Sequence, residues 1–132
     1  MAQAFHLISP GTRVTANGHA DAAEIRTSQT RTYLCTLNIT DQIEQESLDV
    51  SIWGSADGQD FGKQPILKLP QRFYRGETRQ VLDLTTRPEI NFIRAHWDLF
   101  RWGRVAPHPM FVIALRLEEV ATFARQPAGS RA

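Results

Sequence analysis

The chain has 132 residues, enough for one domain with its own core and few for two. A composition of 42% apolar and 22% charged residues excludes both a disordered segment and a membrane-embedded protein. The single cysteine excludes internal disulfides, and a net charge of +1 argues against nucleic acid or an anionic membrane as the partner.

Six segments alternate apolar and polar side chains, the pattern of a β-strand with one buried face. In chain order they are residues 12–17, 22–27, 31–40, 48–55, 77–84 and 110–119. The alternation is strongest in residues 31–40, 48–55 and 110–119. Leu34 is the exception in the first of these, because it falls on the polar face.

Turn-forming dipeptides separate these segments at the short, regular spacing of an all-β domain. They include Asn17-Gly18, Asp57-Gly58, Arg75-Gly76 and Trp102-Gly103. The pattern predicts an antiparallel β-sandwich of the jelly-roll type with about eight strands. We expect residues 1–124 to form this one domain. Residues 125–132 are small, polar and interrupted by Pro and Gly, which predicts a flexible tail.

Residues 88–102 fit two structures. As a strand they place Ile93 and Trp97 inward, with Arg94, His96 and Asp98 on a solvated outer face. As a helix they would begin at Pro88 and end before Gly103, with an apolar stripe through the same segment. The strand is preferred, because a row of cationic, imidazole and carboxylate side chains suits the exposed face of a sheet.

The first ten residues lack the basic and apolar regions of a secretory signal, and no run of about 18 apolar residues occurs. We therefore expect a cytoplasmic protein, either free or incorporated into a particle. In that reducing compartment Cys35 is predicted to be a small buried side chain and not a nucleophile.

Charge is distributed unevenly along the chain. Residues 1–59 contain 3 basic and 7 acidic side chains, and residues 60–132 contain 12 and 7. If the two halves interleave in the fold, these charges are scattered over the surface. If they separate, an acidic and a basic patch would favour head-to-tail association of copies.

No pattern in the sequence predicts an active site, a metal site or a cofactor. His96 and Asp98 are the only candidates for acid–base chemistry, and a hydrogen-bonded surface ladder explains them more simply. Asp57 and Asp60 suggest calcium, but they lack the alternating ligands of a calcium loop and fit a hairpin turn better.

Two segments that mix aromatic and arginine side chains are the candidate binding residues. These residue types dominate interface hot spots and also stack on sugars. The alternative is that Phe73 and Trp102 fold back to cap the sandwich. The candidate contact residues are Arg72, Phe73, Tyr74, Arg75, Arg101, Trp102 and Arg104.

Residues 48–61, with Gly54-Ser55 followed by Asp57-Gly58 and an aromatic residue, resemble a strand and turn of discoidin-like jelly-roll modules. Phe92-Ile93-Arg94 resembles a later strand of the same modules. Similar stretches occur in small β-sandwich proteins of bacteriophage particles. The resemblance covers roughly residues 48–117. It implies the jelly-roll fold and carries over no ligand-binding residue.

The first hypothesis is a non-catalytic structural or assembly module, of phage or prophage type, which binds a protein partner or forms a homo-oligomer. The alternative is a module that binds a carbohydrate or another small ligand through the loop aromatics. A hydrolase or isomerase that uses His96 and Asp98 ranks third. Nucleic acid, membranes and cofactors are not expected.

Overall fold

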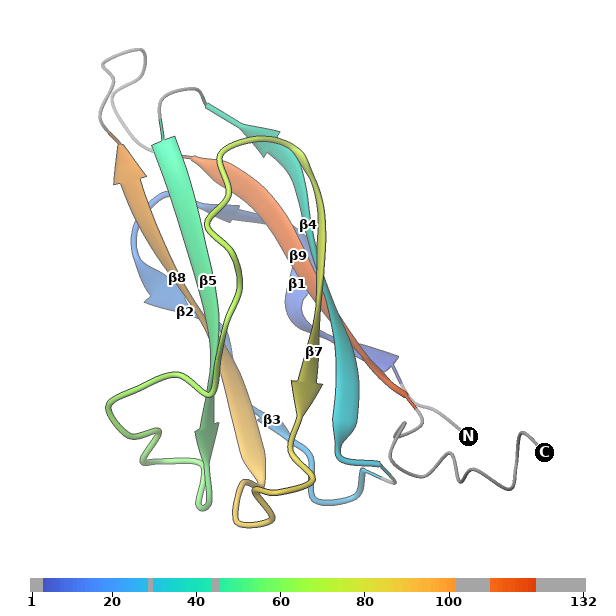
Figure 1. Cartoon of the computed structure of the whole chain (residues 1–132). Helices are drawn as coiled ribbons and strands as arrows, with labels where there is room; N and C mark the ends of the chain where they lie inside the picture. The colour runs from blue at the N-terminus through green and yellow to red at the C-terminus, as the bar shows by residue number, and fades with distance from the viewer. Residues whose placement is uncertain (1–3, 29, 44–45, 102–109, 121–132) are drawn as a thin grey trace, which may run out of the picture.

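The computed structural model describes residues 4–28, 30–43, 46–101 and 110–120, and these residues form an all-β sandwich (Figure 1). In this part of the chain no helix is long and apolar enough to cross a membrane. The described strands are β1 (Ala4–Val14), β2 (Gly18–His19), β3 (Ala23–Glu24), β4 (Thr32–Gln42), β5 (Glu46–Ser55), β6 (Leu67–Lys68), β7 (Gly76–Asp83), β8 (Phe92–Arg101) and β9 (Phe111–Glu119).

The strand pairs are nested, as in a long hairpin that has folded over on itself. β5 pairs with β6, β4 with β7, β2 and β3 with β8, and β1 with β9, all antiparallel. Pairing of β4 with β9 and of β5 with β8 then completes two sheets, ordered β1-β9-β4-β7 and β2-β8-β5-β6. This is the jelly roll, with β2 and β3 as two parts of one interrupted strand.

The predicted strands are confirmed in position, but two of them differ from the observed bounds by more than two residues at one or both ends. Residues 12–17 include only the end of β1, which begins at Ala4, and within residues 22–27 only Ala23–Glu24 form a strand. The first part of β1, residues 4–11, was not predicted. The register of β1 shifts between His6 and Ile8 and again between Ile8 and Thr12, and these shifts break the alternation of side chains.

Residues 92–101 form β8, so the strand is confirmed and the helix is wrong for this segment. Ile93 and Ala95 are fully buried between the sheets. Arg94, His96 and Asp98 alternate with them and occupy the outer face, as predicted.

The core lies between the two sheets and consists of the inward side chains of both. From the middle of one sheet, Leu37 of β4 and Leu115 of β9 are paired and buried. From the other, Leu48 and Val50 of β5 pair with Leu99 and Trp97 of β8. Leu34 points to the outer face and is half-buried, in agreement with its exceptional place in the alternation.

Cys35 is a fully buried core residue, as predicted. Burial raises the pKa of its thiol to about 12, because the low-dielectric interior disfavours the thiolate. We expect the native protein not to react with Ellman's reagent at pH 8, where about one thiol in 10⁴ is ionised. Denaturation in urea should expose one reactive thiol. Native labelling at the denatured rate would contradict this burial.

The nested pairing also decides how charge is distributed. Each pair joins a strand from residues 1–59 to one from residues 60–132, so the acidic and basic halves interleave in both sheets. The structure therefore supports scattered charge, and the separation into two patches is wrong for the described strands. The expected tail, residues 125–132, lies outside the described residues.

Candidate interaction surface

The candidate contact residues that the structure describes lie at one end of the sandwich, where β4 and β8 end and β5 begins (Figure 1). Arg72, Phe73, Tyr74 and Arg75 belong to the segment between β6 and β7. Arg101 is the last residue of β8. The side chain of Arg101, together with Trp102 and Arg104, lies outside the described residues.

Backbone pairing with β5 fixes the position of this segment. Leu48 N donates to Arg72 O at 2.8 Å, and Arg72 N donates to Leu48 O at 3.0 Å. Phe73 follows Arg72 directly and so lies next to the start of β5, where Ser47 pairs with Phe100 of β8.

Among the described residues three large rings are exposed at this end, and we call them the end aromatic surface: Phe73 (38% exposed), Tyr74 (65%) and Phe100 (63%). The rings of Phe73 and Tyr74 are 6.4 Å apart, centroid to centroid. Tyr74 projects into solvent, whereas more than half of Phe73 is covered, so both contact with a partner and capping of the sandwich stay open for Phe73. Phe100 was not among the candidate residues. Its alternation with Asp98 and His96 on the outer face was the signal that could have identified it.

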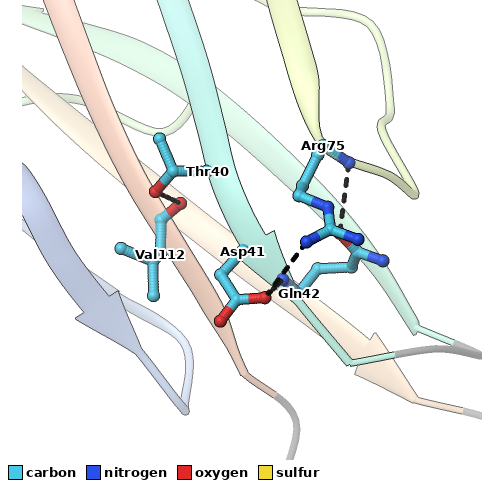
Figure 2. A network of polar contacts seen from close by, with 5 residues as sticks. All are labelled: Thr40, Asp41, Gln42, Arg75 and Val112. Carbon is cyan, nitrogen blue, oxygen red and sulfur yellow. Dashed lines mark hydrogen bonds and ion pairs between the residues drawn. The ribbon is translucent and has the colours of Figure 1, made fainter.

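A β-bulge in β4 positions Arg75 beside this surface (Figure 2). The register shifts between Ile39 and Asp41, so Thr40 is the extra residue, and its Oγ1 donates to Val112 O at 3.3 Å. Beyond the bulge, the Gln42 side-chain carbonyl accepts from Arg75 N at 3.2 Å.

The Arg75 guanidinium lies 3.9 Å from the Asp41 carboxylate, and its side chain remains 66% exposed. An exposed ion pair of this kind contributes about 0–1 kcal/mol. Arg75 therefore pairs only weakly with Asp41, and its guanidinium is still accessible to a partner.

The outer face of the β2-β8-β5-β6 sheet has a second cluster, which we call the histidine ladder: His19, Arg94, His96 and Trp53. The ring of His96 stacks on Trp53 at 4.8 Å and packs against His19 at 5.2 Å. Arg94 Nε donates to His96 Nε2 at 3.0 Å. Arg94 also covers the ring of Phe61 at 4.0 Å.

Partial burial lowers the pKa of His96, and the charge of Arg94 and the neighbouring His19 lower it further. A neutral His96 that accepts a hydrogen bond from Arg94 cannot use that lone pair as a general base. The hydrogen-bonded surface ladder therefore describes this cluster better than an acid–base pair. Asp98 faces Asp49 across the strands and does not bond to His96 in the described contacts.

The turn after β5 is held by side chains that bond to backbone N–H groups. Asp57 Oδ1 accepts from Gln59 N at 2.9 Å and from Asp60 N at 3.0 Å, and Ser55 Oγ accepts from Gly58 N at 2.8 Å. These backbone bonds lower the pKa of Asp57. The Asp57 carboxylate thus serves the turn. Among the described residues no cluster of three His, Cys, Asp or Glu side chains is placed to hold a metal ion.

No protein-family model matches this chain, and no curated protein matches its sequence.

Proposed function

We propose that this protein is a non-catalytic jelly-roll module that assembles with copies of itself through the end aromatic surface. The observation that carries the proposal is the exposure of Phe73, Tyr74 and Phe100 together at one end. Soluble monomers rarely expose clustered large apolar side chains unless these make a contact. Aromatic and arginine side chains also supply most of the energy of protein interfaces.

The chemistry of the surface suits a two-fold contact between copies. In such a contact the same residues meet from both sides, so a patch must be complementary to itself. Tyr74 and Arg75 are adjacent, and Arg75 has an exposed guanidinium. Across a two-fold axis each arginine can stack on the tyrosine of the partner, because cations are attracted to aromatic faces. A place in a phage-type particle is the biological setting that this function suggests.

Sedimentation velocity tests the proposal on the full chain. We expect a dimer or larger oligomer, and we expect Phe73→Ser with Tyr74→Ser to raise its dissociation constant about 30-fold or more, which corresponds to a hot-spot loss of about 2 kcal/mol. Val81→Thr is the matched control, because Val81 is 51% exposed but lies on β7, away from this end. A wild-type protein that remains monomeric at high concentration would overturn the proposal.

A further inference from the structure

A groove lies between edge strands of the two sheets, at the edges away from β6 and β7. β1 is the edge of one sheet, and β2 and β3 form the edge of the other. The cavity between them has a volume of about 430 Å³, within the range of about 300–1,000 Å³ of small-molecule sites. Its polar and aromatic lining consists of His6, Ser9, Thr12, His19, Asp21 and Trp97.

Two features of the backbone open this space. On β1, Ile8 pairs with Leu115 and Thr12 with Ile113, so Ser9, Pro10 and Gly11 bulge opposite a single residue of β9. Thr12 Oγ1 donates to Ser9 O at 2.6 Å and closes the bulge. On the other side, three alanines between His19 and Glu24 line the groove, where larger side chains would fill it.

The same features exclude an added β-strand as the occupant. Pro10 has no N–H to donate, and the bulge interrupts the hydrogen-bonding edge of β1. β2 and β3 have two residues each, too few to guide a further strand. The groove therefore fits a compact ligand better than an extended peptide.

The side chains indicate a ligand without charge. Asp21 is the one carboxylate, and no lysine or arginine is among the described lining residues. An anion would meet only two imidazoles, and a cation only one carboxylate. The hydroxyl, imidazole and carboxylate groups instead match the hydroxyls of a polyol.

Two lining side chains are held in place by their own hydrogen bonds. Trp97 Nε1 donates to Ala16 O at 3.0 Å, which holds the indole in place beside the groove that Trp97 helps to line. His19 Nδ1 lies 3.1 Å from Ala20 O. A carbonyl only accepts, so Nδ1 donates in this contact, and Nε2 is the ring nitrogen left to bond to a ligand hydroxyl, which can both donate and accept. An aromatic wall with hydroxyl-binding groups around it is suited to a sugar ring, which has an apolar C–H face and polar edges.

We propose that this groove binds a neutral mono- or disaccharide, with Trp97 against the sugar face and Asp21 and His19 bonded to its hydroxyls. This site is separate from the end aromatic surface, where the sequence placed the alternative carbohydrate function. It also does not depend on self-association.

Titration of the ¹⁵N-labelled full chain by NMR tests the proposal. The probes are glucose, galactose, mannose, N-acetylglucosamine, maltose, lactose and cellobiose, each added to about 20 mM, since a single sugar site can have a dissociation constant near 1 mM. We expect at least one sugar to shift the Trp97 indole N–H together with the amides of residues 6–9, 11–12 and 19–23. No shift with any of these sugars would overturn the proposal. So would shifts centred on Phe73 and Tyr74.

Two variants and a matched control make the test specific to the groove. Ala22 is exposed at its rim, so Ala22→Phe should block entry and weaken binding about tenfold or more. Asp21→Ala should weaken it by a similar factor. Ala56→Phe adds the same ring at an exposed alanine outside the groove and should leave binding unchanged. Shifts of the same resonances by sodium phosphate or by a lysine peptide, but not by sugars, would overturn the proposal. Loss of self-association in the end-surface variant would leave sugar binding intact, so the two proposals fail separately.

Discussion

Leu115→Ala is expected to lower the free energy of unfolding by about 2–5 kcal/mol, a large part of the stability of a domain of this size. Leu115 is fully buried at the middle of β9. It pairs with Ile8 of β1 on one side and with Leu37 of β4 on the other, both buried as well. Truncation removes apolar contacts and leaves a cavity that three fixed strands cannot collapse to fill.

Urea denaturation followed by circular dichroism measures this effect. The control is Val81→Thr, which keeps a β-branched side chain at an exposed position and should change stability by no more than about 0.5 kcal/mol. A loss below about 1 kcal/mol for Leu115→Ala would mean that the two sheets do not enclose a close-packed core.

Alternation along the chain was sufficient to predict which side chains of β4, β5 and β9 belong to that core. β4, β5 and β9 are regular for most of their length, so residues such as Leu37, Val50 and Leu115 could be assigned to an inner face from the sequence. The same reasoning decided that residues 92–101 are a strand, since Ile93 and Ala95 are buried while Arg94 and His96 face outward. A period of two is a local property, and it survives wherever pairing is regular.

Features that depend on irregular or distant pairing were not predictable in this way. β2, β3 and β6 have two residues each, and a two-residue strand has no period to detect. The groove lies between the bulge in β1 and the alanines that follow β2, and no local pattern reports that these two segments face each other. Likewise, Phe100 and Phe73 lie at the same end because Phe100 pairs with Ser47 and Arg72 with Leu48, which requires the pairing of three segments.

Gly54 provides the second large effect, because it allows close packing at the end of β5. A Cβ at this position would lie 2.9 Å from Cδ1 and 3.0 Å from Cγ2 of Ile90, closer than side chains pack. It would also lie 3.2 Å from Ile66 Cδ1. Ile90 is buried, so it has little room to yield. We therefore expect Gly54→Ala to destabilise the fold by about 1–3 kcal/mol through overpacking.

A double-mutant cycle separates this steric cause from a backbone effect. Ile90→Ala alone should cost about 2–5 kcal/mol, because it leaves a cavity. Combined with Gly54→Ala, the total loss should fall short of the sum by about 1 kcal/mol or more, since the new methyl group occupies that cavity. The matched control is Gly11→Ala, where φ is +77° and nothing lies within 4 Å of the added Cβ.

The loss of stability in Gly11→Ala comes from backbone strain alone. It should therefore add to the loss of stability in Ile90→Ala. Additive losses in both cycles would mean that Ile90 does not limit the space at Gly54. Coupling confined to the Gly54 cycle would place Gly54 against Ile90 in solution. That contact lies beside the turn held by Ser55 and Asp57. The packing at Gly54 and the hydrogen bonds of the turn would then together determine that β5 ends at Ser55.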